Sequence, residues 1–199
     1  MKVLVVGASG TIGKFVIKEL APRHEIIEVG KDQGQYQVDI ASENSVRQLF
    51  NKVGKVDAIV AVAGNVYWGP LKEMTVDQFK IGLHEKLMGQ VNLALVGQRF
   101  LNDGGSITLT SGSLSHDPYV GGASFTTVNS AIDGFVRGAA IELERGCRIN
   151  SVSPNVLKES WDTYGPGVPG TDAVPGEKVA LAFRKSVEGR QSGQTYRVS

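Results

Sequence analysis

Seven residues near the N-terminus have the types and spacing needed to hold a phosphate group. Residues 7–13 read Gly-Ala-Ser-Gly-Thr-Ile-Gly and lie between an apolar run and an amphipathic segment. Gly7 allows a tight turn, Gly10 lets a pyrophosphate approach the backbone, and Gly13 allows close helix packing. The helix N-terminus adds free amides and a partial positive charge. The alternative is a plain strand-to-helix turn, but the pattern favours dinucleotide binding by Gly7, Ser9, Gly10, Thr11, Ile12 and Gly13.

A second group of residues bears on which dinucleotide would bind. Residues 30–32, after the second apolar run, read Gly-Lys-Asp. A cation at this position favours a 2′-phosphate, whereas an acid repels it, so Lys31 predicts NADP(H) rather than NAD(H). The alternative is a solvated loop lysine, and Asp32 beside it weakens the pattern. Asp39 and Ile40 are expected near the adenine, unless Asp39 caps the following helix.

The elements that must position these residues alternate along the whole chain, which is typical of βαβ units around a parallel sheet. Helices are expected at residues 12–20, 43–53, 76–101 and 124–144, the third with a bend at Gly82 or Gly89. The six residues between Val29 and Tyr36 are too few for a crossover helix, so the second crossover is expected to be a loop. Strands are expected at residues 3–6, 25–29, 36–39, 58–63, 106–110, 148–152 and 195–198. We therefore predict one domain over residues 1–199, a doubly wound α/β Rossmann sheet of about seven strands with helices on both faces.

Composition narrows the classes of partner. The chain has 199 residues, with 21 Lys and Arg against 20 Asp and Glu, and a formal net charge of +1. Because its net charge is close to zero and it has no long run of like charges, the chain is not expected to bind nucleic acid or a membrane surface. Cys147 is the single cysteine, so neither an intrachain disulfide nor a cysteine metal cluster is expected. No signal peptide or membrane helix is predicted, which favours a cytoplasmic protein.

Residues 155–177 are rich in glycine and proline and are expected to form a long loop or lid over a site. Trp161 and Tyr164 lie inside this segment and, with Thr127, are candidates to line a substrate pocket. Residues 67–70, Tyr-Trp-Gly-Pro, add further aromatic rings. These residues predict a small-molecule substrate bound in an apolar, aromatic pocket.

The chain resembles the short-chain dehydrogenases/reductases, a Rossmann family that uses NAD(P)(H) on alcohols and ketones, over nearly its whole length. Residues 7–13 match its phosphate loop, 61–64 (Ala-Val-Ala-Gly) match its Asn-Asn-Ala-Gly motif, and 105–111 match the strand before its catalytic serine. Residues 134–154 match the helix and strand after the active site. The resemblance implies further cofactor contacts from Ala63, Gly64, Asn129, Pro154 and Val156.

The resemblance fails at the family's catalytic residues. Counting back from residues 132–134, Phe125 and Asn129 occupy the positions of the Tyr-x-x-x-Lys pair, and Gly112 that of the serine. In that family the tyrosine exchanges the proton, while the lysine lowers its pKa and holds the nicotinamide ribose. The resemblance leaves Asn92 as the catalytic asparagine of the long helix.

Other polar side chains nearby in the sequence are candidates to replace the missing residues. Ser111 or Ser113 could polarise a carbonyl group. The alternative is that both serines are ordinary polar residues at the end of a strand. Tyr119 and His116 are weak candidates for the acid, because surface loop residues of these types are usually solvated. His84 and Lys86 are expected to be solvated or at a subunit contact.

Three functions stay open from the sequence. The first is an NADP(H)-dependent oxidoreductase on a small carbonyl or alcohol with a rebuilt proton relay. The second is a non-redox enzyme on the same fold, such as an isomerase, dehydratase or cyclase, and the third is an NADP(H) sensor without turnover. The resemblance also implies a homodimer or homotetramer joined through the helices at 76–101 and 124–144.

Overall fold

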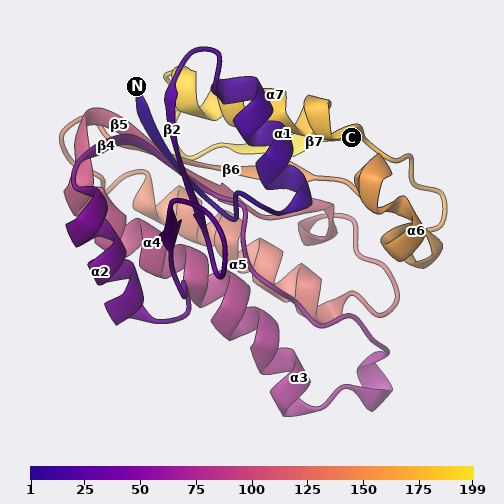
Figure 1. Cartoon of the computed structure of the whole chain (residues 1–199). Helices are drawn as coiled ribbons and strands as arrows, with labels where there is room; N and C mark the ends of the chain where they lie inside the picture. Colours follow the sequence, from indigo (N-terminus) through magenta and orange to yellow (C-terminus); the bar gives the residue numbers. More distant parts are fainter.

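The computed structural model describes all residues, 1–199, and its centre is a parallel sheet of seven strands (Figure 1). The strand order is β3-β2-β1-β4-β5-β6-β7, and every neighbouring pair is parallel. This order confirms the predicted Rossmann sheet, in which the chain runs outward from β1 in both directions. The strands are β1 Lys2–Val6, β2 Glu25–Gly30, β3 Tyr36–Gln37, β4 Val56–Ala61, β5 Leu101–Thr110, β6 Arg148–Pro154 and β7 Thr195–Val198.

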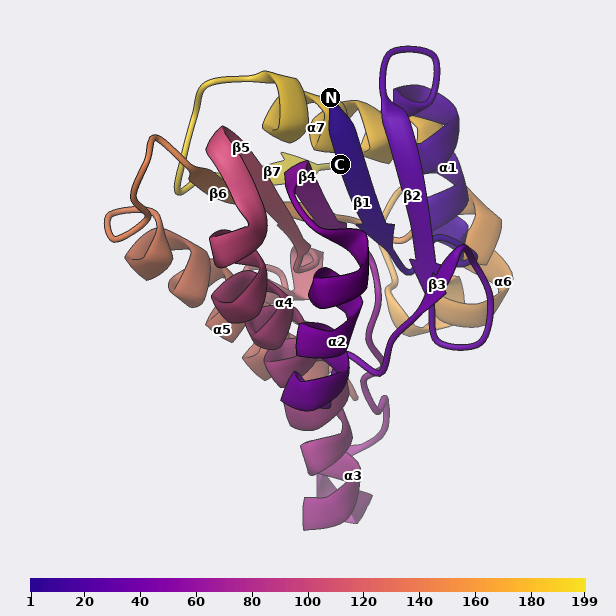
Figure 2. The ribbon, with the colours of Figure 1, turned by 60° about the vertical axis from the view of Figure 1, so that its left-hand side comes forward.

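Helices cover both faces of this sheet, as predicted (Figures 1 and 2). Helices α1 Thr11–Leu20 and α7 Gly176–Glu188 pack together on one face, and α2 Glu43–Val53, α4 Gly89–Gly97 and α5 Ala123–Ala139 lie on the other. Strand β1 is buried on both faces, because Val3 and Val5 join the core under α1 and α7 while Leu4 and Val6 join the opposite core. No helix is long and apolar enough to cross a membrane.

The predicted long helix at 76–101 is divided in the structure. It begins as α3 Val76–Ile81, continues as a π-helix over Gly82–Met88, and ends as α4 followed by a 3-10 turn at Gln98–Phe100. A Cβ at Gly82 would lie 2.9 Å from Val66, and one at Gly89 would meet Ile40, so both glycines permit close packing. The two glycines at which a bend was predicted thus mark the start of the π-helix, at Gly82, and of α4, at Gly89.

Other element bounds also differ from the predictions. Helix α5 ends at Ala139 rather than at 144, before a turn in which Arg145 and Gly146 have positive φ. Strand β5 starts at Leu101, and helix α7 was missed although Val179, Phe183 and Val187 repeat at helical spacing. The second crossover is a loop over residues 31–35, as predicted.

The segment predicted as a lid is partly helical. It contains 3-10 turns at Lys158–Ser160 and Gly165–Gly167, with the short helix α6 Trp161–Tyr164 between them. An isolated bridge between Leu157 and Val174 closes the segment at its base. Figure 1 shows α6 set apart from the other helices, beyond the end of β6. The segment thus stands where the strands end, which is the edge at which Rossmann sheets bind ligands.

Candidate functional site

The turn between β1 and α1 has the geometry of a phosphate-binding loop. Gly7 has φ +93°, and a Cβ there would lie 2.7 Å from the carbonyl oxygen of Val62, so only glycine fits. A Cβ at Gly13 would lie 2.7 Å from the Ala8 oxygen, which explains the third glycine as a packing requirement. At Gly10, by contrast, a Cβ would meet only the Gly7 oxygen, at 3.3 Å, and the space outside the turn is open.

The first amides of α1 have no partner inside the protein. Gly10 precedes the helix without a side-chain cap, and the first turn has no acidic residue. The backbone N–H groups of Ser9, Thr11, Ile12 and Gly13 donate to no protein acceptor. Unpaired amides at a helix N-terminus attract an anion, so the turn fits the pyrophosphate of a dinucleotide.

A cleft on the β2 side of this turn, which we call the β2 cleft, contains the residues predicted to bind the adenosine half. Lys31, from the loop after β2, is exposed at this cleft. Asp39 accepts a hydrogen bond from the Ala41 amide, at 3.1 Å, and the cap of α2 is Ser42, so Asp39 is not the helix cap. The lining residues are Val6, Gly7, Gly30, Lys31, Val38, Asp39, Ile40, Ala41, Ala63, Gly64, Asn65 and Glu85.

The structure corrects the role predicted for Asn92. Its side-chain amide donates to the backbone oxygens of Ile40, at 2.9 Å, and Ala41, at 3.4 Å. The side chain is buried behind the wall of the β2 cleft and does not reach the second cleft described next. Asn92 therefore holds the backbone at 40–41 and is not a catalytic residue.

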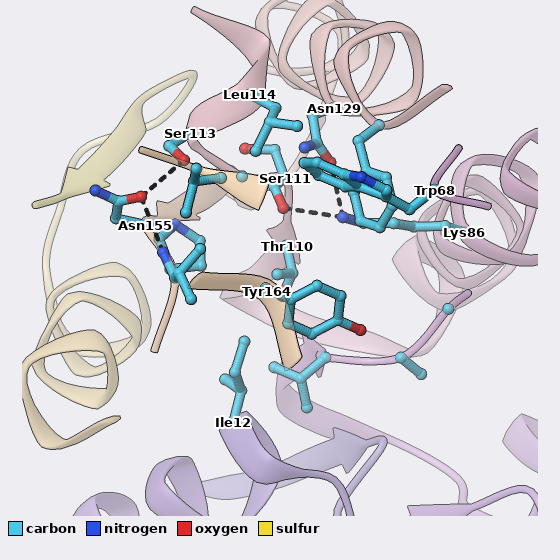
Figure 3. Close-up of a pocket in the computed structure, with 18 residues that line it drawn as sticks. Ile12, Trp68, Lys86, Thr110, Ser111, Ser113, Leu114, Asn129, Asn155 and Tyr164 are labelled. Carbon is cyan, nitrogen blue, oxygen red and sulfur yellow. Dashed lines mark hydrogen bonds between the residues drawn. The ribbon is translucent and has the colours of Figure 1, made fainter. Parts of the chain in front are cut away.

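The second cleft, the β5 cleft, lies at the ends of β4, β5 and β6 (Figure 3). Ala63 and Gly64 line both this cleft and the β2 cleft, so the two clefts meet there. Six residues predicted as cofactor contacts line one or both clefts, and so do the two candidate serines, Ser111 and Ser113. The six are Ile12, Ala63, Gly64, Asn129, Pro154 and Val156. The residues that line the β5 cleft are Ile12, Val62, Ala63, Gly64, Trp68, Lys86, Thr110, Ser111, Gly112, Ser113, Leu114, Phe125, Asn129, Pro154, Asn155, Val156, Tyr164 and Val168.

Lys86 is the main correction to the predicted site. Expected to be solvated or at a subunit contact, it is instead buried at the floor of the β5 cleft, and only His84 is exposed. Its Nζ donates to Oδ1 of Asn129, at 2.7 Å, and to the backbone oxygen of Ser111, at 3.0 Å (Figure 3). Burial lowers the pKa of the Lys86 ammonium from its ordinary 10.5 to about 8, while the charge of Asp133 acts in the opposite direction.

A sequence signal for Lys86 existed but was weak. Gly82 precedes Lys86 by four residues, and a Cβ at Gly82 would touch Ser124 and Val128 of α5. Positions four apart share one helix face, so the spacing of Gly82 and Lys86 places the lysine against α5 as well. That Gly82 packs against α5 is apparent only from the structure, so the spacing alone does not predict the position of Lys86.

The two candidate serines differ in their surroundings. Ser111 Oγ is buried and has no hydrogen-bond partner, whereas Ser113 Oγ donates to Oδ1 of Asn155, at 3.2 Å. Between them, a Cβ at Gly112 would lie 2.8 Å from Nδ2 of Asn129. Glycine at 112 therefore leaves room for the Asn129 amide, and the free hydroxyl of the site is that of Ser111.

Three aromatic side chains, those of Trp68, Phe125 and Tyr164, also line the β5 cleft. The rings of Trp68 and Phe125 meet edge to face with centroids 5.5 Å apart. Tyr164 brings its ring into the same cleft from α6, as Figure 3 shows. Trp161 does not line the cleft, and its ring packs on Gly165.

Three further candidates lie outside the β5 cleft. Thr127 is exposed and donates to the Ala123 oxygen, so its predicted place in the pocket is wrong. Tyr119 is hydrogen-bonded to Asp117 and to Thr171, and His116 is an exposed loop residue. None of the three contributes a proton donor to the cleft.

Comparisons with known proteins agree with this geometry. The family model for enoyl-(acyl carrier protein) reductase, one of the short-chain dehydrogenase/reductase models, matches residues 14–179. The chain belongs to the short-chain dehydrogenase/reductase family. Versicolorin reductase stcU from Emericella nidulans is 31% identical over 140 residues, which are 67% of this chain and 53% of that protein. The match spans 53% of the length of this relative, and 59% and 62% of the lengths of the short-chain dehydrogenase/reductase GME11373 from Pestalotiopsis microspora and of versicolorin reductase 1 from Dothistroma septosporum.

Solved structures cover the chain completely. The protein lin1944 from Listeria innocua is 47% identical, with a TM-score of 0.98 and complete coverage of both chains. A small-chain dehydrogenase in complex with NADPH is 26% identical, with a TM-score of 0.89, and covers all of this chain and 96% of its own. The fold is therefore shared along the whole chain, and the family model covers residues 14–179 of it.

Membership of this family makes the floor of the β5 cleft unusual. The resemblance implied an asparagine from the long helix and a lysine from α5. Here the lysine, Lys86, comes from the long helix, and the asparagine, Asn129, comes from α5. The two residue types have exchanged helices, yet their side chains still meet, at 2.7 Å.

Proposed function

We propose that the protein is an NADP(H)-dependent oxidoreductase that interconverts a small carbonyl compound and its alcohol. The observation that carries this proposal is that the β2 and β5 clefts meet at Ala63 and Gly64, beside the unpaired amides of α1. A dinucleotide needs such a pair of clefts with an anion site between them. The solved small-chain dehydrogenase in complex with NADPH, which is similar to this chain over its whole length, supports NADP(H) as the cofactor.

Each part of the site would bind one part of the cofactor. The amides of Ser9 and residues 11–13 would hold the pyrophosphate, and Lys31 would pair with the 2′-phosphate. Asp39 and Ile40 would border the adenosine, and the nicotinamide would enter the β5 cleft past Ile12. When bound, the nicotinamide supplies hydride transfer. The chain supplies orientation, exclusion of water and the proton.

The lining of the β5 cleft supports an uncharged substrate with an apolar group beside its carbonyl. Trp68, Phe125, Leu114, Val168 and Tyr164 offer aromatic and aliphatic surface, and no carboxylate lines this cleft. Such a surface binds an aryl or alkyl ketone through burial of its apolar area, and the polar floor fixes the oxygen.

Stereospecifically deuterated NADPH and a panel of aryl and alkyl ketones test the proposal. Deuterium in the product alcohol, with matching loss of NADPH absorbance, supports it. Substrate that is converted without oxidation of NADPH contradicts it in favour of an isomerase, dehydratase or cyclase. The absence of any conversion, together with tight NADPH binding, indicates a binding protein.

This last outcome, an NADP(H)-binding protein without turnover, is the second candidate function. The observation that favours it is Phe125, which packs on Trp68 at the position where the family has its proton-exchanging tyrosine. A phenyl ring cannot exchange a proton, so turnover requires another donor in the cleft.

We also propose that the chain forms a homodimer or homotetramer through α4 and α5. A second, mainly apolar groove runs between these helices and includes Leu95, which is 49% exposed, with Phe135 and Leu143. A Leu95→Asp variant should shift the protein toward monomer in light scattering, whereas an unchanged mass would place the contact elsewhere.

A further inference from the structure

The ammonium group of Lys86 has one donor that the protein does not use. A lysine ammonium carries three N–H donors and no acceptor. Two of them are directed to Asn129 Oδ1 and to the Ser111 backbone oxygen, and the structure shows no third acceptor. Because Lys86 also lines the β5 cleft, its third N–H is available to a ligand there.

Lys86 also fixes the direction of the Asn129 amide. Since the ammonium can only donate, Oδ1 of Asn129 must face Lys86, and Nδ2 must point away from it. Nδ2 then lies beside Gly112, where the missing Cβ leaves space at the cleft. The hydroxyl of Ser111, buried and unpaired at the same floor, is a third group with an unused donor.

The groups around Lys86 keep it protonated and yet able to release a proton. Burial disfavours the charged form of Lys86, while the negative charge of Asp133, on α5, favours it. Glu85, the neighbouring residue, is hydrogen-bonded to Asn65, at 2.7 Å, and the two residues that accept from the Lys86 ammonium, Ser111 and Asn129, are uncharged. The only other titratable side chain that lines the cleft is Tyr164, which is 44% exposed.

We infer that Lys86 is the proton donor of the proposed reduction, and that Asn129 and Ser111 hold the carbonyl oxygen beside it. This inference rests on the proposed function. NADPH provides a hydride to the carbonyl carbon and is oxidised to NADP⁺, and the C=O π pair takes a proton from Lys86 Nζ to form the alcohol O–H. Lys86 is left as a neutral amine that regains its proton from water. The pKa of about 8 is close to that of an effective general acid at neutral pH.

This arrangement explains why Phe125 is tolerated. The proton comes from the long helix rather than from α5, so the family tyrosine position is free to pack against Trp68. Gly112 belongs to the same change, because a side chain there would collide with Asn129 Nδ2. Four positions thus differ from the family pattern in a mutually consistent way.

The test compares Lys86→Gln, which keeps a hydrogen-bond donor but cannot give a proton, with Lys80→Gln as the matched control. Lys80 is a half-exposed lysine on α3 paired with Asp77, away from both clefts. In the unaltered protein and in Lys80→Gln, the rate of ketone reduction should fall as the pH rises through about 8. Lys86→Gln should lose this dependence and about 10²-fold or more of kcat. Its Kd for NADPH should stay within about threefold, because a neutral amide keeps the floor in place.

A spectroscopic readout separates proton donation from a structural role. In NMR of protein with ¹³C-labelled lysine, one Cε resonance should titrate near pH 8, be absent from Lys86→Gln, and shift when NADP⁺ and the alcohol bind. Lys86→Met is the second variant if Lys86→Gln does not fold. Tyr164→Phe asks whether the phenol is the acid, and it should keep the pH dependence near 8.

Each contrary outcome has a distinct meaning. If the unaltered protein transfers no hydride, the proposed function fails and this assignment fails with it. Hydride transfer with the same kcat and pH profile in Lys86→Gln overturns the role of Lys86 alone. A loss of NADPH affinity without a change in kcat would make Lys86 a cofactor ligand, which also overturns it.

Discussion

The turn at residues 7–13 and the floor of the β5 cleft are built in opposite ways. In the turn, the binding groups are backbone amides, and the glycines either shape the chain or leave space. At the floor, the binding groups are side chains of Lys86, Ser111 and Asn129, from a π-helix, a strand end and a second helix. The first design is local in sequence, and the second depends on tertiary packing.

The turn and the floor therefore differ in how strictly they constrain the sequence. The turn needs its glycines at fixed spacing, because any Cβ at Gly7 or Gly13 meets backbone atoms. The floor needs a polar cluster but not a fixed order, since Lys86 and Asn129 meet at 2.7 Å from exchanged helices. In the proposed function, a phosphate-binding turn of the family type thus accompanies a floor whose polar residues differ from the family pattern.

The largest expected effect is a loss of NADPH affinity in Gly10→Val, a change at the turn that should leave the fold intact. Gly10 has φ −72° and ψ 169°, which any residue adopts, so Gly10→Val should fold normally. The valine side chain would occupy the space of the pyrophosphate and reduce NADPH affinity by about 10²-fold or more. Fluorescence titration measures this loss, with circular dichroism as the control for folding. Retained binding in a folded variant would show that the turn is only structural.

A second prediction concerns the pH dependence of stability at the floor. Between pH 8 and 10.5 the folded chain binds fewer protons at Lys86 than the unfolded chain does, so the free energy of unfolding should rise with pH there. The full shift corresponds to about 3 kcal/mol, with the folded state bearing the whole burial penalty below pH 8. Urea unfolding at several pH values should show this rise in the unaltered protein relative to Lys86→Met. Parallel curves for the two proteins would mean that the amine is not held buried.

A third prediction concerns the preference of the β2 cleft for NADPH over NADH. Lys31→Ala should weaken NADPH binding by about tenfold and leave NADH binding nearly unchanged, because an exposed lysine pairs with the 2′-phosphate alone. Lys52→Ala, an exposed lysine of α2 outside this cleft, is the matched control. Equal affinities of the unaltered protein for NADPH and NADH would contradict the assignment.

The smallest expected effect concerns the support behind the β2 cleft. Asn92→Ala removes the hydrogen bonds to Ile40 and Ala41 and should cost about 1 kcal/mol of stability. Because Asn92 lies outside the β5 cleft, kcat should change less than twofold. A loss of kcat comparable to that of Lys86→Gln would restore Asn92 as a catalytic residue.

The sequence predicted what local patterns determine. The turn at 7–13, the parallel Rossmann sheet, the missing crossover helix and most cleft residues follow from glycine spacing, alternation of elements and family resemblance. Lys86 was misjudged because its role depends on the π-helix at Gly82–Met88 and on its contact with Asn129, 43 residues away. The same limit applies to Asn92, whose partner backbone at 40–41 lies about 50 residues earlier in the chain.

The structure also changes how a standard family site would be restored. Phe125→Tyr with Asn129→Lys, the design that the sequence suggests, would place a second ammonium against Lys86 in a buried floor. Like charges without an acceptor between them are unfavourable there, so the exchange must include Lys86→Asn. The triple variant is therefore the consistent design, and the double variant should lose stability.

The most direct test of the whole account is a crystal structure with NADPH bound. We expect the pyrophosphate on the amides of Ser9 and residues 11–13, and the 2′-phosphate beside Lys31. We expect the nicotinamide in the β5 cleft, with Lys86 still hydrogen-bonded to Asn129. A cofactor bound elsewhere, or a Lys86 side chain turned out to solvent in the complex, would contradict it.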